Sequence, residues 1–152
     1  WISDYIHRRN LPMYISNITT LLVCLGLIFY TDQLNIFGIS VLMFLLGFCS
    51  SGFILAFAVM REKNRPEVAG TAIGFINMLN TFGGAYFQYL IGKILDLTAK
   101  DVVVSQTGEK VFSLQDYQTA LLSLPFCLTV SLITLLFLKE TYCRPVALNS
   151  TS

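Results

Sequence analysis

The stretch Ile36–Met60, IFGISVLMFLLGFCSSGFILAFAVM, contains 25 residues and no charged side chain. An α-helix rises about 1.5 Å per residue, so about 20 apolar residues cross the roughly 30 Å hydrocarbon core of a bilayer. Three further charge-free stretches of similar length occur in the chain, and the four together predict an all-α integral membrane protein with four transmembrane helices. The 19 charged residues (10 basic and 9 acidic) are confined to five islands: Asp4–Arg9, Asp32, Arg61–Glu67, Lys93–Asp116 and Lys139–Arg144.

The overall composition supports the membrane prediction. The chain is 55% hydrophobic and 12% charged, with a mean hydropathy of +0.66, whereas soluble domains carry about 25% charged residues. There is too little polar material to cover a soluble core. Strands of a membrane barrel alternate polar and apolar residues, and these stretches do not, so we expect helices. No basic stripe indicates a nucleic-acid partner, and the predicted partner is the lipid bilayer.

Local signals place the four expected helices. Pro66 fits the first turn of a helix, where its missing N–H costs nothing, and Glu67 favours the positive end of the helix dipole. Ser113 and Asp116 have the spacing of a capping box, and Pro125 predicts a kink inside the last helix. The expected spans are 11–30, 36–60, 68–95 and 117–138, with an external loop at 97–116 and a cytoplasmic tail at 139–152.

The distribution of Lys and Arg predicts which side of the membrane each island faces, because cytoplasmic loops are richer in these residues. Seven basic residues fall on one side and three on the other. This places both ends of the chain and the 61–67 island in the cytoplasm. The external loop contains two apolar segments, 102–104 and 110–112, that predict a small hairpin. The basic residues are Arg8, Arg9, Arg61, Lys63, Arg65, Lys139 and Arg144 on the cytoplasmic side, and Lys93, Lys100 and Lys110 outside.

The sequence does not predict catalysis. His7 is the only histidine, and it lies among charges at the expected membrane surface. No carboxylate pair, metal-ligand cluster or Ser-His-Asp set falls within the spans, so we expect neither an enzyme nor a metal or other cofactor. Three of the four cysteines lie inside the spans without CxxC spacing, and we interpret them as small apolar packing residues.

The most polar of the expected spans is 68–95. Asn77, Asn80 and Gln88 recur at spacings that place them on one helix face. A buried amide in a membrane needs a hydrogen-bonding partner, and two interpretations remain open. These residues either border an aqueous substrate cavity or form hydrogen bonds between helices. Phe48 and Ser51 of span 36–60 line the same cavity under the first interpretation, and small residues there provide close packing under the second.

Glycines in span 68–95 indicate helix packing. Gly70 and Gly74 form a GxxxG pattern, which favours close approach of a second helix. Gly83 and Gly84 predict a closely packed midpoint, with a hinge as the alternative. No ionisable residue lies near the middle of any span, so no proton relay or counter-charge for an ionic substrate is evident.

The first nine residues, WISDYIHRR, resemble the cytoplasmic signature loop of the major facilitator superfamily. That loop reads roughly Gly-x-Leu-Ala/Ser-Asp-Arg-x-Gly-Arg-Arg. Its Ser, Asp and paired Arg are matched, but Tyr5 stands for Arg and His7 for Gly. Segments 66–75 and 138–141 are similar to the start of helix 11 and the exit from helix 12. The chain, which opens with Trp1, is therefore expected to be a C-terminal fragment holding helices 9 to 12 of twelve, part of the C-terminal six-helix half of this fold.

The resemblance implies a secondary transporter whose two halves rock around a central site. It implies transmembrane transport of a small organic solute by alternating access, coupled to a cation or a proton, in a bacterial inner membrane. Helix 10 would line the cavity and helix 11 would flank it. Partners for the gate residues would lie in the missing N-terminal helices. The residues so implicated are Phe48, Ser51, Asn77, Asn80 and Gln88 in the substrate cavity, and Asp4, Arg8, Arg9 and Glu67 in the cytoplasmic gate.

A four-helix membrane scaffold or interaction protein is the alternative of a different class. About eight further spans before Trp1 would favour a transporter, and a nearby start codon would favour the small scaffold. A membrane-embedded enzyme is less favoured, because no ionisable cluster is present. The mid-span polar groups are neutral amides and hydroxyls, which suit a polar organic solute.

Overall fold

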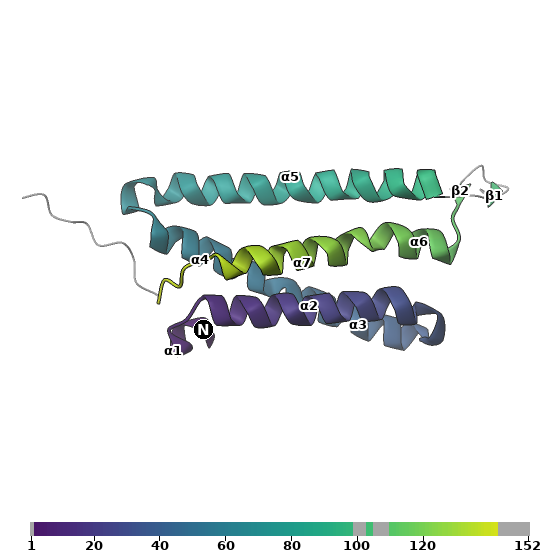
Figure 1. Ribbon diagram of the computed structural model, residues 1–152, viewed down its shortest axis with the longest axis horizontal. Helices are drawn as coiled ribbons and strands as arrows, with labels where there is room; N and C mark the ends of the chain where they lie inside the picture. Colours follow the sequence, from purple (N-terminus) through teal and green to yellow (C-terminus); the bar gives the residue numbers. More distant parts are fainter. Residues whose placement is uncertain (1, 99–102, 105–109, 143–152) are drawn as a thin grey trace, which may run out of the picture.

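The computed structural model describes residues 2–98, 103–104 and 110–142, and in it four long helical segments lie lengthwise in one bundle, each antiparallel to the one before it in the chain (Figure 1). Consecutive segments are connected at alternate ends of the bundle. The first consists of α1 (Ile2–Ile6), α2 (Asn10–Tyr30) and the 3-10 turn η1 (Thr31–Gln33); the second of α3 (Ile36–Ser50), the 3-10 turn η2 (Ser51–Phe53) and α4 (Ile54–Lys63); the third of α5 (Pro66–Thr98); and the fourth of α6 (Leu114–Leu121) and α7 (Ser123–Leu136).

The all-α prediction is confirmed, and within the described residues three helical segments are long and apolar enough to cross a membrane. The third long segment, α5, does not reach that hydropathy. Its amides Asn77, Asn80 and Gln88 lower the mean hydropathy of an otherwise apolar helix. Large apolar side chains cover the outside of the bundle, and Phe44 is 71% exposed. Such a surface is typical of helices that face lipid. The three candidate spans are Asn10–Gln33, Ile36–Lys63 and Leu114–Leu136.

Three helix boundaries follow the local signals in the sequence. Pro66 is the first residue of α5. Ser113 and Asp116 form the predicted capping box, in which Asp116 N–H donates to Ser113 Oγ (3.3 Å) and Ser113 N–H donates to Asp116 Oδ2 (2.9 Å). The last segment is interrupted at Leu122, between α6 and α7. Pro125 accounts for the interruption, because it has no N–H to donate and its ring crowds the carbonyl four residues earlier.

The second segment also has an interruption, which the sequence analysis did not predict. The helix tightens into η2 at Ser51–Phe53, halfway between its ends. A Cβ added at Gly52 would lie under 3.0 Å from both Cβ and Oγ of Ser16, so only glycine allows η2 to pack this closely against α2. The Ser16 hydroxyl donates to the carbonyl of Cys49, next to the break. A 3-10 stretch inside a longer helix is a common position for a hinge.

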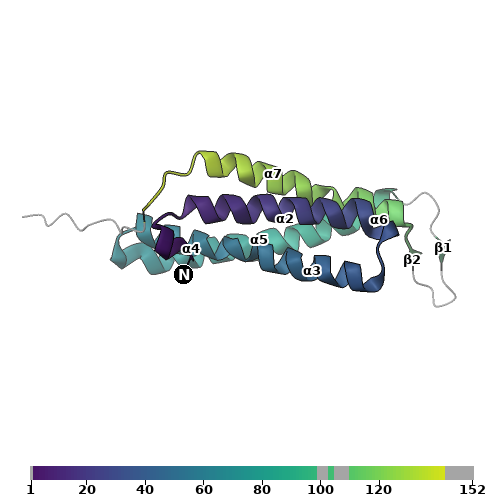
Figure 2. The same cartoon turned by 90° about the horizontal axis from the view of Figure 1, so that it is seen from below.

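The packing of the segments is uneven. Helix α2 packs against both α3 and α7, whereas α5 contacts mainly α4 near one end and α6 near the other (Figures 1 and 2). A Cβ added at Gly70, Gly74, Gly83 or Gly84 would meet nothing within 4 Å. Within the described residues, a second helical segment comes this close to a glycine at Gly52, and the close approach predicted at the other four glycines stays a prediction.

The predicted hairpin is present between α5 and α6. Strands β1 (Val103–Val104) and β2 (Lys110–Val111) pair antiparallel, with Val103 opposite Val111. It lies at the end of the bundle opposite α1 (Figure 1). The tail at 143–152, the loop residues 99–102 and 105–109, and Trp1 lie outside the described residues.

Candidate functional site

The helix α1, the end of α4 and the end of the fourth segment lie at the same end of the bundle (Figure 1). Charged and polar side chains from these three places contact one another. We call this group the rim cluster. It joins the first, second and fourth helical segments through side chains far apart in the sequence. Its members are Ser3, Asp4, Arg9, Asn10, Glu62, Glu140 and Thr141.

Arg9 is at the centre of the rim cluster. Its Nε and Nη2 donate to Glu62 Oε1 at 2.9 and 2.6 Å, and its Nη1 lies 2.6 Å from Asp4 Oδ1 and 3.0 Å from Ser3 Oγ. Arg9 and Glu62 are each 9% exposed. A buried guanidinium is tolerated when its donors are satisfied by a carboxylate, and removing either partner leaves an uncompensated charge. Arg9 and Glu62 therefore hold α4 against the start of α2.

Glu140 connects the end of the fourth segment to the rim cluster. Its Oε1 and Oε2 accept from the backbone N–H groups of Arg9 (2.7 Å) and Asn10 (3.0 Å). Arg9 is the N-cap residue of α2 and Asn10 is its first residue, and the Arg9 side chain makes no capping hydrogen bond. A carboxylate from the end of the fourth segment thus supplies the cap that α2 lacks locally.

The same contacts set the acidity of Glu140. Burial favours a higher pKa for its carboxyl, but backbone N–H bonds from Arg9, Asn10, Thr141 and Tyr142 outweigh it, and the pKa lies below its ordinary value. Hydrogen bonds to the ionised form are the physical cause of such a shift. Glu140 therefore carries a negative charge at neutral pH.

Two further hydrogen bonds complete the connection. Asn10 Nδ2 donates to the carbonyl of Leu138 at 2.6 Å. Thr141 Oγ1 donates to Glu62 Oε2 at 2.5 Å. Glu62 is therefore bonded on one oxygen by Arg9 and on the other by Thr141, so it bridges α2 and the end of the fourth segment.

The turn that delivers Arg9 to this position depends on His7. The N–H of Arg8 donates to the Ser3 carbonyl and that of His7 donates to the Asp4 carbonyl, both at 3.3 Å. This pair of bonds is the Schellman arrangement that ends a helix with a left-handed residue. His7 takes that role with φ of 53°. Glycine adopts a left-handed φ more readily than a residue with a Cβ, so a histidine at this position is uncommon.

The structure brings together only some of the predicted gate residues. Asp4 and Arg9 meet in the rim cluster, but the side chains of Arg8 and Glu67 are exposed and make no hydrogen bond or ion pair with any described residue. Arg9 pairs with Asp4 and Glu62 inside this chain, and further partners on helices outside this chain stay a prediction. The role of Glu62 was not predicted from the sequence. The signal for it was a carboxylate one residue beyond Arg61, at the end of a long apolar span.

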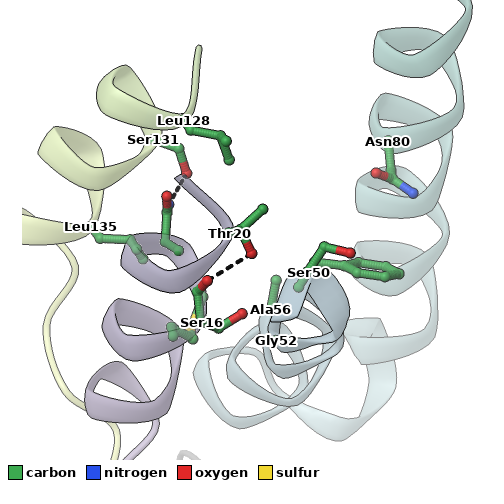
Figure 3. Close-up of a pocket in the computed structure, with 12 residues that line it drawn as sticks. Ser16, Thr20, Ser50, Gly52, Ala56, Asn80, Leu128, Ser131 and Leu135 are labelled. Carbon is green, nitrogen blue, oxygen red and sulfur yellow. Dashed lines mark hydrogen bonds between the residues drawn. The ribbon is translucent and has the colours of Figure 1, made fainter. Parts of the chain in front are cut away.

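A second candidate site lies at mid-height between the helices, and we call it the central pocket (Figure 3). It is a partly open cavity of about 410 Å³ to which all four helical segments contribute side chains. No charged side chain is among the described residues that line it. Its lining residues are Met13, Ser16, Asn17 and Thr20 of α2, Ser50 of α3, Gly52 and Phe53 of η2, Ala56 of α4, Asn80 of α5, and Leu128, Ser131 and Leu135 of α7.

Hydrogen bonds fix several polar side chains of the central pocket. Asn17 Nδ2 donates to Ser131 Oγ at 2.9 Å, which links α2 to α7, and Thr20 Oγ1 donates to the Ser16 carbonyl at 2.7 Å (Figure 3). The Oδ1 of Asn17 is buried and accepts no hydrogen bond from any described residue. A buried acceptor without a donor is uncommon in proteins and indicates an additional partner at that position.

The predicted cavity residues do not converge on one pocket. Asn80 lines the central pocket. Phe48 and Ser51 line a neighbouring cavity of about 450 Å³ between the first and second helical segments, and Gln88 lines a third beside Lys93 and Asp96. Asn77 is exposed on α5. The sequence analysis missed the hydroxyl side of the pocket, although Ser16 and Thr20 have the spacing of one helix face.

The fold defines the class of the protein: an all-helical chain with three candidate membrane spans, consistent with a multi-pass membrane protein. No group of three or more metal-ligating side chains occurs in the part of the chain that the structure describes. No protein-family model, curated protein or solved structure matches the chain.

Proposed function

We propose that this chain is part of a secondary transporter of the major facilitator type, and that it moves a small organic solute across a bacterial inner membrane by alternating access. In this proposal all four helical segments span the bilayer, and α5 is shielded by helices outside this chain. The rim cluster lies on the cytoplasmic side, as the excess of Lys and Arg at that end favours. The solute moves with a cation or a proton.

The observation that carries the proposal is the rim cluster itself. Arg9, Glu62 and Glu140 bind three helical segments together at one end of the bundle through charge-assisted contacts, of which the Arg9–Glu62 pair is buried and the Glu140 contact is partly buried. A purely structural link between apolar helices does not need a buried ion pair, because apolar residues of the same size provide similar or greater stability. A charged link is useful where it must be broken and remade, since water stabilises the separated ions.

The central pocket supplies the second element that alternating access requires. It lies between the helices and adjoins the helix break at η2. In transporters, interrupted helices commonly form the solute site. A solute that binds one arrangement of the break more tightly than the other shifts the population of the two states by its differential affinity.

Uptake by the full-length protein in membrane vesicles tests the proposal. We expect time-dependent accumulation of at least one solute from a panel of sugars, polyols, amino acids and organic acids, and its collapse when the ion gradient is dissipated. Asp4→Asn should lower the uptake rate with little loss of protein in the membrane, because Asp4 contacts Arg9. Folded, inserted protein that moves none of the panel would favour the scaffold alternative.

A further inference from the structure

We propose that the central pocket binds a neutral polyhydroxyl solute, such as a polyol or a monosaccharide. This inference rests on the proposed transport function and names its substrate class. It is carried by three features of the pocket: the absence of charge in its lining, the excess of hydrogen-bond acceptors, and its position at a helix break.

The first feature is the absence of charge. None of the residues that line the central pocket is ionisable at neutral pH. A charged solute there would have no counter-charge, and an unpaired ion in a low-dielectric environment costs several kcal/mol. The charged groups of the rim cluster are already engaged with one another. The pocket therefore favours a solute without net charge.

The second feature is that the lining accepts more hydrogen bonds than it donates. The hydroxyls of Ser16, Thr20 and Ser50 each donate their single proton to a backbone carbonyl, namely those of Cys49, Ser16 and Gly47. Their oxygens keep lone pairs free toward the pocket. Asn17 Oδ1 is a further buried acceptor without a donor among the described residues.

Donors are fewer. Ser131 Oγ accepts from Asn17 and keeps its own proton for a ligand. Asn80 brings an amide from the opposite wall of the pocket (Figure 3). A ligand that fits this lining must supply several O–H or N–H donors while accepting a few bonds, and it must be neutral. Hydroxyl groups, which donate and accept at the same atom, meet both demands.

The third feature is the position of the pocket. Its volume of about 410 Å³ falls within the roughly 300–1,000 Å³ typical of small-molecule sites. Ser50 lines it from before the helix break, Gly52 and Phe53 from within it, and Ala56 from after it. A bound solute therefore contacts both halves of the second segment and can favour one geometry of η2 over another.

Binding measurements on the full-length protein in lipid nanodiscs test this inference. The probes are radiolabelled xylitol and glucose, compared with gluconate and glucosamine, which have a similar size to glucose but carry a charge. We expect saturable binding of a neutral probe and at least tenfold weaker binding of the charged pair. Asn17→Leu and Ser131→Ala should each weaken the binding of the neutral probe by about three- to tenfold, the effect of one lost hydrogen bond.

The matched control is Ser40→Ala. Ser40 is exposed on α3, donates to the Ile36 carbonyl and lies outside the pocket lining, so its removal should change binding by less than about twofold. Thermal unfolding of each variant identifies loss of fold, and Ser131→Ala serves if Asn17→Leu is unstable. The inference is overturned if neither neutral probe binds, if a charged probe binds as tightly, or if both pocket variants bind like wild type.

These results separate the inference from the transport proposal. Binding as expected, without uptake of any solute by vesicles, would keep the pocket assignment and remove the transport function. Uptake of charged solutes without binding of xylitol or glucose would keep the transport function and remove the pocket assignment.

Discussion

The rim cluster and the central pocket are both polar groups within an apolar bundle, but the rim cluster pairs charged side chains with one another, whereas the pocket is lined by neutral groups. Asn10 Oδ1 of the rim cluster and Asn17 Oδ1 of the pocket are both buried without a donor among the described residues. In the rim cluster, both Glu62 oxygens and the Arg9 guanidinium are bonded inside the chain. In the central pocket, the hydroxyls have bonds to the backbone, while Asn17 Oδ1 has no donor among the described residues. A satisfied charged group holds helices together, and an unsatisfied neutral group is available to a ligand.

The difference separates two roles that the sequence pattern alone does not distinguish. The charged side chains of the rim cluster lie at the end of the bundle, where water can solvate the ions when they separate. The neutral polar side chains of the central pocket lie at mid-height, where an ion without a partner would cost free energy. Substitutions at the two sites should therefore act differently, with large effects on stability at the rim cluster and effects on ligand binding at the pocket.

The largest expected effect is at Glu62. Glu62→Ala removes the main partner of the buried Arg9 and should destabilise the protein by about 3–5 kcal/mol. Thermal unfolding in detergent or nanodiscs measures it. The control is Glu67→Ala at an exposed carboxylate nearby, where we expect a change within about 0.5 kcal/mol. Equal destabilisation by the two variants would contradict a stabilising role of the buried Arg9–Glu62 ion pair.

A smaller effect is expected at Gly52, where the central pocket adjoins the helix break. Gly52→Ala places a Cβ against Ser16 and should cost about 1–3 kcal/mol through overpacking. Gly47→Ala is the matched control, because its Cβ would meet nothing within 4 Å. The double variant Gly52→Ala with Ser16→Gly should recover part of the loss. If Gly52→Ala unfolds at the same temperature as Gly47→Ala, η2 does not pack closely against α2.

His7→Gly should stabilise the protein. Glycine adopts a positive φ without the roughly 1–2 kcal/mol cost that other residues incur there, and part of this gain is offset by the greater freedom of glycine in the unfolded chain. We expect a net gain of about 1 kcal/mol in the free energy of unfolding. His7→Ala is the control and should give no gain. A loss of stability in His7→Gly would show that the imidazole has a role beyond the turn.

The smallest expected effect is a pH dependence at Glu140. Its pKa is lowered in the folded protein, so its ionised form stabilises the fold above the pKa of the unfolded chain. That contribution is lost as the pH falls through the folded pKa, which places the change below about pH 5. Glu140→Gln should therefore flatten the acid limb of the stability profile, whereas Glu67→Gln should leave it as in wild type. An unchanged acid limb in Glu140→Gln would exclude this carboxylate as the cap of α2.

The sequence predicted the helices and most of their boundaries because those depend on local chemistry. Apolar runs, Pro66 and the Ser113–Asp116 capping box act within a few residues of themselves. The break at η2 was not predicted, since it depends on how Gly52 meets Ser16 from another helix. No local pattern in a charge-free run specifies such a contact.

The candidate sites were predicted only in part for the same reason. Asp4 and Arg9 belong to a charged motif that is visible in the sequence. Arg9 also bonds to Glu62 and Glu140, which lie 53 and 131 residues away in the chain. Asn80 was predicted on a polar helix face. The opposing wall of Ser16, Asn17 and Ser131 depends on how α2 packs against α7, which no local pattern specifies.

The most direct test of the account compares transport by wild type, Glu62→Gln and Asp32→Asn in vesicles that hold equal amounts of each protein. Asp32 is an exposed carboxylate of η1, at the opposite end of the bundle. The account predicts solute accumulation by wild type and by Asp32→Asn. It predicts at least a tenfold lower rate for Glu62→Gln, because a neutral amide removes the buried carboxylate partner of Arg9 and leaves the exposed Asp4 carboxylate beside it. Uptake by Glu62→Gln at the wild-type rate would contradict it.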